Sequence, residues 1–418
     1  MDPTRRDFLA ATARLTAGAA LVPGGLPAAR PPCRPFASLR AGSVSSPDDP
    51  LGVRDDFPIT RNRIYLNTAY IAPIPKPVAA AVQAFNEKRM NEPLNVGDLL
   101  RQVGATRARF AKFINATPEE VGLLYTTSEG ENIVANTIPW QRGDNVVVDD
   151  LHYEAAFVIY RQLEKRLGVE LRIVPSRNGA AEAKDYEPYV DGRTKLVSVA
   201  WVSSVNGYRH DMKAIAEVAH AKGALVYVDA IQAVGMFPVD VQAAGIDVLC
   251  CGTYKWLLGG FGVAPLYIRK DVQDRIRPDR FGAFSVQDEL PGHRFELRNK
   301  SAGKFTYATL PFAEVYQLKE ALEYLEKVGV ARIEEYTVGL AAKLRTGLVS
   351  QGQEVMTPEG NRSSIVSFKM KSDTAIVERR LAEGKVDVTV RDSREVRVSP
   401  AMFNSRDEID TLLGLTQR

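Results

Sequence analysis

Two stretches of the chain decide its fold class: residues 224–232, which read ALVYVDAIQ, and residues 246–256, which read IDVLCCGTYKW. Each contains a run of apolar residues followed by polar ones, with Asp229 closing the first run and Lys255 following the second. Such runs are typical of strands that are covered on both faces of a parallel sheet. Because ligands bind beyond the carboxyl ends of parallel strands, we expect Asp229 and Lys255 at one edge of such a sheet.

The same pattern continues on both sides of these two stretches. Apolar, β-rich runs alternate with helical stretches, one of which is expected at 212–222. This alternation predicts an α/β domain with three layers, α/β/α, around a mostly parallel sheet of seven strands. The seven expected strands are 121–125, 145–149, 171–174, 195–201, 224–229, 246–251 and 263–268.

After about residue 283 the regular alternation of β-rich runs with helical stretches ends. A long helix is expected at 313–327, followed by strands near 364–370 and 386–390 and a closing helix at 406–413. This order is typical of a smaller α+β domain. We therefore predict a large domain at 57–283 and a small C-terminal domain at 284–418.

The first residues differ from the rest of the chain. Residues 4–9, Thr-Arg-Arg-Asp-Phe-Leu, precede a modest apolar stretch at 10–22 that is too short to span a bilayer. Paired arginines in this context resemble a twin-arginine (Tat) signal peptide, which we place at 1–30; a disordered basic tail is the alternative. Residues 31–56, rich in Pro, Ser and Asp, read as a linker. The expected location is periplasmic after Tat export, without stable membrane association.

Composition excludes several classes of function. Lys and Arg number 54 and Asp and Glu number 51 among 418 residues, a net charge of +3, which gives no strong field for binding nucleic acid. The three cysteines, Cys33, Cys250 and Cys251, have no histidine cluster nearby, so neither a metal site nor a disulfide framework is expected. The sequence thus favours a globular protein that acts on small molecules.

Asp229 and Lys255 together predict a pyridoxal 5′-phosphate (PLP) site. A lysine amine can hold this cofactor as a Schiff base, and a carboxylate opposite the ring nitrogen keeps that nitrogen protonated. Gln232 is placed to bond the ring hydroxyl. A lone lysine is more often a solvated surface charge, but Trp256 and the apolar residues after it make Lys255 a poor surface residue.

The cofactor phosphate needs donors of its own, and residues 125–130, YTTSEG, offer them between a strand and a helix. A helix N-terminus presents free N–H groups and a positive dipole to an anion. We therefore predict Thr127 and Ser128 as phosphate ligands, with Thr253 as a further donor. Taken alone, the same residues could be a helix N-cap only.

From about Tyr65 onward the chain resembles the class V aminotransferase family of fold type I PLP enzymes. This family includes cysteine desulfurases, isopenicillin N epimerase-like proteins and amino-acid lyases. The matching pieces are residues 65–69, 127–129, 228–232, 253–255, 305–309 and 396–400.

The resemblance implies further roles around the ring. Tyr153 matches the residue that stacks on the cofactor ring, with His152 as the neighbouring candidate. Ser204 falls near the ring hydroxyl. Thr309, preceded by Ala308, matches a pair that contacts the phosphate from the other subunit, so the resemblance implies a homodimer with shared active sites.

For the substrate, the resemblance implies Arg397 as the residue that binds the α-carboxylate of an amino acid, with Arg391 as a second candidate. The alternative for Arg397 is a surface ion pair with Glu395 or Asp392. Lys255, once released by the substrate, is expected to remove the α-proton as a general base.

One departure from the family limits the function. Desulfurases of this family place a reactive cysteine between the positions that match Arg391 and Arg397, where this chain has only residues 392–396, and no cysteine follows Cys251. We therefore favour an aminotransferase or an isopenicillin N epimerase-like enzyme acting at the α-carbon of an amino acid. The alternative is a β-eliminating C–S lyase of the cysteine or selenocysteine lyase kind. A PLP-binding protein without turnover is the alternative that is not an enzyme.

Overall fold

The computed structural model describes residues 49–371, 373–391 and 394–417. The predicted signal peptide at 1–30 and most of the predicted linker lie outside these residues. No helix in the described part of the chain is long and apolar enough to cross a membrane. Within the same ranges there is no group of acidic, histidine or cysteine side chains that could hold a metal ion.

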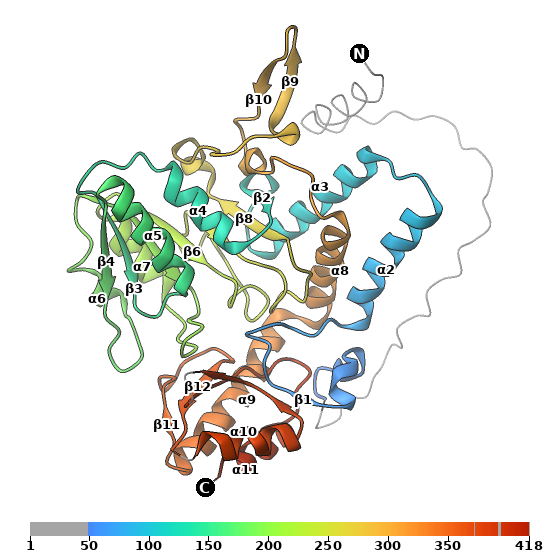
Figure 1. The fold of residues 1–418 in the computed structure, drawn as a ribbon, viewed down its shortest axis with the longest axis vertical. Helices are drawn as coiled ribbons and strands as arrows, with labels where there is room; N and C mark the ends of the chain where they lie inside the picture. The colour runs from blue at the N-terminus through green and yellow to red at the C-terminus, as the bar shows by residue number, and fades with distance from the viewer. Residues whose placement is uncertain (1–48, 372, 392–393, 418) are drawn as a thin grey trace.

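A seven-stranded sheet forms the centre of the molecule (Figure 1). Only β8 is antiparallel to its neighbours β2 and β7, so the sheet is mostly parallel and the predicted fold class is confirmed. In spatial order the strands are β2 (Val121–Leu124), β8 (Ala264–Ile268), β7 (Val248–Cys250), β6 (Leu225–Asp229), β5 (Thr194–Ala200), β3 (Asn145–Asp149) and β4 (Glu170–Val174).

Two apolar cores cover the two faces of this sheet. On one face, Val146 and Val148 of β3 pack with α4 (Thr127–Thr137) and α5 (Glu154–Leu167). On the other face, Val147 belongs to the core that contains α3 (Val96–Phe113) and α7 (Met212–His220). Successive side chains of a strand point to opposite faces, so a strand with helices on both sides is apolar at every position.

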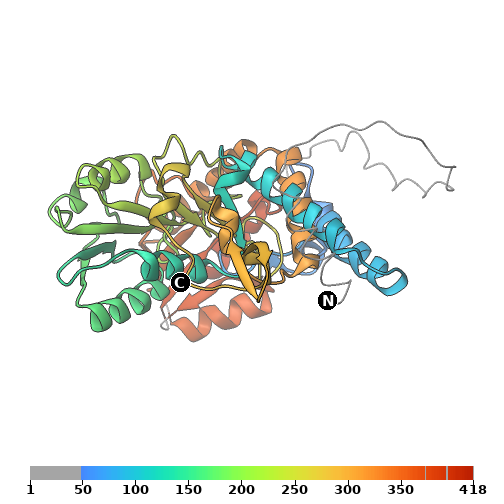
Figure 2. The same cartoon turned by 90° about the horizontal axis from the view of Figure 1, so that it is seen from above.

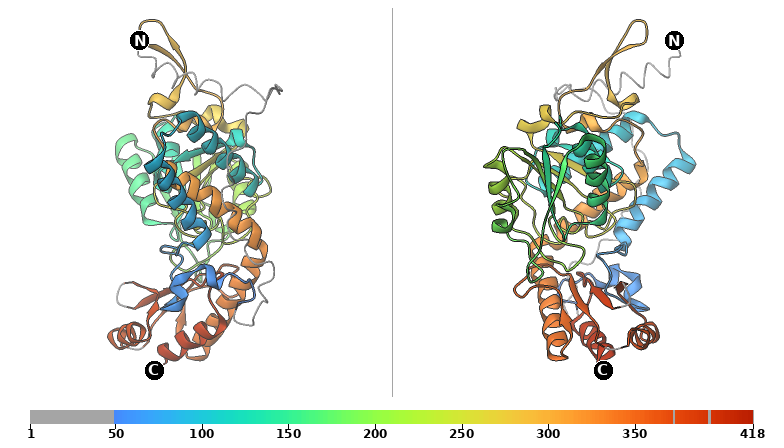
Figure 3. Two further views of the ribbon diagram at one scale, coloured as in Figure 1. Left: turned by 90° about the vertical axis from the view of Figure 1, so that its right-hand side faces the viewer. Right: turned by 60° about the vertical axis from the view of Figure 1, so that its left-hand side comes forward.

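The C-terminal part folds around a second, antiparallel sheet. Its strand order is β11 (Glu354–Val355), β12 (Val366–Lys369), β15 (Glu395–Val398) and β14 (Thr389–Arg391). The helices α9 (Val330–Ser350), α10 (Thr374–Glu383) and α11 (Arg406–Thr416) pack against it. In both views of Figure 3 this unit lies at the end of the molecule opposite the β9–β10 hairpin (Val286–Leu290 and Arg294–Leu297).

The beginning of the described chain joins the C-terminal unit. Strand β1 (Ile64–Tyr65) pairs in parallel with β13 (Val386–Asp387). Residues 49–56, assigned from the sequence to a linker, are held in place because Asp49 accepts the N–H groups of Val53 and Arg54. Arg54 also donates a hydrogen bond to Glu408 of α11, which lies 354 positions later in the chain. Residues 49–56 are therefore folded, because they contact residues that are distant in sequence.

The division of the chain at 283/284 stays a prediction, but one helix beyond it packs on the large domain. Helix α8 (Phe312–Val328) lies along α2 (Lys76–Asn91) and α3. Figure 2 shows this helical group to one side of the sheet layers. The regular alternation of strands and helices ends near residue 283, but which helices pack together is set by the tertiary structure.

The loop that carries Lys255 rests against Gly235. Gly235 has a φ of +94°, and a Cβ built there would lie 2.4 Å from the carbonyl oxygen of Trp256. Gly235→Ala is therefore expected to destabilise the fold by about 2 kcal/mol, because both the backbone conformation and the contact become strained. Thermal or urea unfolding measures the change.

The matched control is Gly339→Ala, since Gly339 lies in α9 with no atom within 4 Å of a built Cβ. Alanine should stabilise that helix by up to about 1 kcal/mol. An unfolding free energy that is unchanged by Gly235→Ala would contradict the expected strain.

Candidate active site

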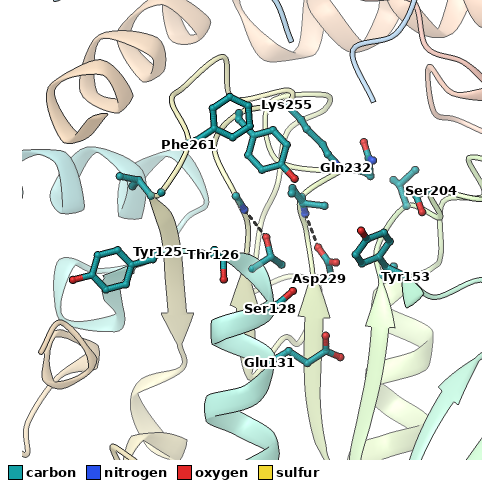
Figure 4. Close-up of a pocket in the computed structure, with 18 residues that line it drawn as sticks. Tyr125, Thr126, Ser128, Glu131, Tyr153, Ser204, Asp229, Gln232, Lys255 and Phe261 are labelled. Carbon is teal, nitrogen blue, oxygen red and sulfur yellow. Dashed lines mark hydrogen bonds between the residues drawn. The ribbon is translucent and has the colours of Figure 1, made fainter. Parts of the chain in front are cut away.

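A cavity of about 520 Å³ opens at the carboxyl edge of the large sheet (Figure 4). Three elements converge there: the N-terminus of α4, the end of β6 and the loop that follows β7. Of the predicted site residues, the following line it: Thr127, Ser128, Tyr153, Ser204, Asp229, Gln232 and Lys255.

Asp229 lies deep in this cavity at the last position of β6. Its side chain is buried, and one carboxylate oxygen, Oδ1, accepts the N–H of Ile231 at 2.9 Å. Burial raises the pKa of Asp229, while the Ile231 N–H and the positive charge of Lys255 oppose that rise. The carboxylate is thus held in place by backbone and faces into a region with little water.

Lys255 approaches the same cavity from the loop after β7. Burial lowers the pKa of its amine to about 8; Asp229 opposes this shift, and the positive charges of Arg397 and Arg391 reinforce it. A neutral amine is the form that attacks an aldehyde. Near neutral pH a usable fraction of Lys255 is therefore ready to form a Schiff base.

The start of α4 is the predicted anion site. Thr126 is the N-cap, and its hydroxyl accepts the N–H of Glu129 at 3.1 Å. Thr127 and Ser128 are then the first helical residues and line the cavity, and the Thr127 hydroxyl accepts the N–H of Gly252 at 2.8 Å. Thr126 is thus the N-cap, and the binding of the phosphate by Thr127 and Ser128 stays a prediction.

Thr253 does not line this cavity. Its buried hydroxyl donates to the carbonyl oxygens of Gly260 at 2.7 Å and of Val263 at 3.2 Å. The structure therefore contradicts the predicted contact with the phosphate, because the side chain turns into its own loop. Thr253 holds the two ends of the Lys255 loop together instead.

Thr309 also lies outside the cavity of its own chain. It is exposed, and its carbonyl oxygen accepts the hydroxyl of Tyr125 at 2.8 Å. A role for Thr309 in the site of a second subunit, and the homodimer itself, stay predictions.

Tyr153 lines the cavity and is half exposed, whereas His152 points away from it. The His152 ring is buried, with Nε2 at 3.1 Å from the Ser198 hydroxyl. Of the two candidates, only Tyr153 lines the cavity, and its stacking on the cofactor ring stays a prediction.

Gln232 faces the cavity with both ends of its amide already engaged. Its Nε2 donates to the carbonyl of Ala69 at 2.9 Å, and its Oε1 accepts the indole N–H of Trp256 at 2.7 Å. An amide nitrogen carries two hydrogens. One N–H therefore remains for the predicted bond to a ring hydroxyl.

Arg397 is buried beside the cavity. Its guanidinium donates to the carbonyl of Ser204 at 3.0 Å and to the hydroxyl of Thr389 at 3.3 Å, while its Nε has no partner within the described residues. Burial, helped by the charge of Arg391, lowers the pKa of Arg397 to about 10. Among the described carboxylates none pairs with it, so Glu395 is not its partner; Asp392 lies outside the description.

Burying a cation without a counter-ion costs free energy, and binding of an anion offsets that cost. Arg397 therefore suits the predicted role of binding a substrate carboxylate. Arg391, partly buried on β14 opposite Glu395, is farther along the same sheet and stays the second candidate.

Comparison with known proteins fits this geometry. Residues 64–412 match the class-V aminotransferase family. The chain belongs to this family. A probable cysteine desulfurase of Methanothermobacter thermautotrophicus is 32% identical over 77% of this chain and 81% of its own length. An uncharacterized aminotransferase of Bacillus subtilis is 28% identical over 85% of this chain and 94% of its own.

Solved structures of the family share the fold. The apo structure of a cysteine desulfurase from Thermococcus onnurineus superposes with a TM-score of 0.81 at 25% identity, over 91% of this chain and 98% of the other. A cystine C–S lyase complex gives a TM-score of 0.80 at 21% identity, over 86% and 98%. The lyase also exists as a mutant with glycine covalently linked to its PLP cofactor.

This class-V aminotransferase family member is therefore a PLP-dependent enzyme. The residues present fit the cofactor: Lys255 and Asp229 share one cavity, and the N-terminus of α4 offers an anion site in the same cavity. Bound PLP would supply an electron sink for charge that develops at the substrate α-carbon.

Among the lining residues that sequence reasoning did not predict is an acidic one, Glu131. It lies on α4 and is buried, and burial followed by the charge of Asp229 raises its pKa to about 8. Helical spacing was the available signal, because residues three and four apart share one helix face and both Thr127 and Ser128 were already candidates.

The depressed pKa of Lys255 predicts how the cofactor-free protein takes up PLP. The amine is neutral above its pKa, so the rate of uptake should rise with pH and level off above a midpoint near 8. An ordinary lysine would give a midpoint of about 10.4. Stopped-flow absorbance follows the reaction, with Nα-acetyllysine as the reference for ionisation of PLP itself.

Arg397→Gln is the matched variant, because removing a nearby positive charge should raise the pKa of Lys255 and shift that midpoint upward. A wild-type midpoint near that of free lysine, or an unmoved midpoint in the variant, would contradict this electrostatic account.

Proposed function

We propose that this PLP-dependent enzyme is a β-eliminating C–S lyase that acts on cysteine or a related sulfur amino acid. The relatives named above include a probable cysteine desulfurase and a cystine C–S lyase, so chemistry at a carbon–sulfur bond recurs among them. This interpretation corresponds to the alternative that the sequence left open, rather than to the aminotransferase or epimerase that it favoured.

The placement of the thiols carries the choice of elimination over desulfuration by a cysteine of the enzyme. Cys250 and Cys251 are buried at the end of β7, and neither lines the cavity. Burial, together with the nearby charge of Asp229, raises the pKa of both thiols well above its ordinary value. A thiolate is the nucleophilic form, so neither residue is suited to accept sulfur from a substrate.

The remaining residues can perform an elimination. Arg397 binds the substrate carboxylate, and Lys255, freed as an amine, removes the α-proton. Asp229 would keep the ring nitrogen of bound PLP protonated. The Cα–H and Cβ–S bonds break, sulfur leaves with the bonding electrons of the Cβ–S bond, and a Cα=Cβ bond forms. With cysteine and one water, the products are pyruvate, ammonia and hydrogen sulfide.

Transamination is the second candidate, because the first proton transfer is common to both reactions and one relative is named an aminotransferase. The epimerase interpretation rests on the resemblance alone. Export by the Tat route to the periplasm also stays a prediction, since the signal lies outside the described residues.

Product analysis distinguishes these reactions. Incubation with L-cysteine or L-cystine should yield pyruvate and ammonia in equal amounts, and no pyruvate with Lys255→Ala. Alanine as the main product would indicate desulfuration, and conversion of the cofactor to its pyridoxamine form would indicate transamination. Either outcome would contradict the proposal.

Cys33→Ser is the control for the third thiol, which lies outside the described residues. The lyase should keep its full rate of pyruvate formation in this variant, because no thiol of the chain takes part. A large loss of activity there would show that a cysteine of the enzyme carries sulfur after all.

A further inference from the structure

The reaction outlined above leaves one acidic side chain of the cavity without a role. Glu131 is 2% exposed and lies in the floor of the cavity below Asp229 in Figure 4. It comes from α4, one turn after Thr127 and Ser128, which begin the same helix. Burying a carboxyl group costs free energy unless the group is paired with a cation, hydrogen-bonded or protonated.

A directed chain of hydrogen bonds ends on Glu131. The backbone N–H of Tyr153 donates to Nδ1 of His152 at 2.8 Å, so Nδ1 is the acceptor nitrogen of that ring. The proton of the neutral ring is then on Nε2, which lies 3.1 Å from the Ser198 hydroxyl. Ser198 in turn donates to Oε1 of Glu131 at 3.0 Å.

The backbone N–H of Tyr153 fixes the direction of these hydrogen bonds, because a backbone N–H can only donate. Burial lowers the pKa of His152 to about 4, so the ring is neutral near neutral pH and offers Glu131 no positive charge. Nε2 of His152 lies 3.9 Å from Oε1 of Glu131, and both side chains are almost fully buried. The contact is therefore polar, but it is not an ion pair.

The other titratable groups near Glu131 supply no cation either. Asp229 of β6 is the acidic neighbour, and on its own helix Glu129 is paired with Arg280. Within the described residues no lysine or arginine is paired with Glu131. The neighbouring side chains with pKa values raised by burial are Tyr160 of α5, Tyr227 of β6 and Cys250 of β7.

We propose that Glu131 is a positioning residue that carries a proton beside Asp229, so that the two carboxyl groups in the cavity floor together hold a single negative charge. The ring nitrogen of the cofactor is thereby offered one ionised carboxylate. This inference concerns the cofactor site and does not depend on the lyase proposal.

Physical reasoning supports one proton for the pair. Two carboxylates in a region of low dielectric repel one another, and one of them takes up a proton at a pH where both would be ionised in water. Asp229 has the Ile231 N–H and the positive charge of nearby Lys255 to stabilise its ionised form, whereas Glu131 has only the neutral hydroxyls of Ser198 and Tyr160 and is repelled by Asp229. Glu131 is therefore the member that keeps the proton.

Infrared difference spectra of the cofactor-free protein test the assignment directly. Between about pH 6.5 and about pH 9.5, wild type should lose the carbonyl band of a protonated carboxyl group. The band should be absent from Glu131→Gln and should persist in Asp229→Asn with a lower midpoint, since a repelling charge has been removed. A band that is absent from Asp229→Asn but present in Glu131→Gln would assign the proton to Asp229 and overturn the proposal.

Ser198→Ala gives a second, milder variant in case the change at Glu131 impairs folding. The Ser198 hydroxyl stabilises the ionised form of Glu131, so its removal should move the midpoint of the band upward. An unmoved midpoint would contradict the hydrogen-bonded chain.

Cofactor affinity gives a readout that needs no turnover. Pyridoxamine 5′-phosphate, which binds without a Schiff base, is the probe, and its dissociation constant is measured by fluorescence for wild type and Glu131→Gln. The two should agree at about pH 6.5, and wild type should weaken about tenfold relative to the variant one pH unit above the midpoint, because binding must then take up a proton. Ionisation of the probe and of Lys255 cancels in the ratio. A ratio that does not change with pH would overturn the proposal.

Discussion

The parallel register of β5, β6 and β7 places Ala200, Asp229 and Cys250 next to one another at one edge of the sheet. Everything in the site depends on this alignment, because it fixes the ends of the strands from which the cavity walls start. The register is strongly specified, since a shift by one residue would move every side chain of a strand to the core on the opposite face, where its packing neighbours differ. A fully buried strand thus positions the carboxylate of Asp229, and the short segment from Cys251 to Lys255 that follows β7 brings the amine to the same cavity.

Burial is the largest single influence on the charged groups of the cavity. It raises the pKa of Asp229 and Glu131 and lowers the pKa of Lys255 and Arg397. Each pKa shift increases the population of the neutral form of the group. The groups that stay charged have a fixed partner in the protein or are expected to bind a ligand of opposite charge. An apolar scaffold can in this way prepare acid–base chemistry near neutral pH.

The scaffold alone does not determine which reaction follows. A desulfurase and a C–S lyase share this fold with the present chain, and the carboxylate, lysine and arginine of the site suit several reactions that begin at the α-carbon. Of the two described thiols, Cys250 packs against Gly130 of α4, and neither Cys250 nor Cys251 lines the cavity, which supports the proposed elimination. Chemistry within the family is therefore set by a few side chains around a common framework.

The sequence by itself determined the seven strands, the positions of Asp229 and Lys255 and the helix start at residues 126–128. Periodicity and strand ends report burial and backbone conformation, which neighbouring residues largely specify. Only the tertiary structure decided that Tyr153 rather than His152 faces the cavity, that Thr253 turns into its loop and that Glu131 joins the floor. It also decided that residues 49–56 fold against the C-terminal unit. These features depend on which distant segments pack together, and a side chain takes its direction from partners that a linear pattern does not contain.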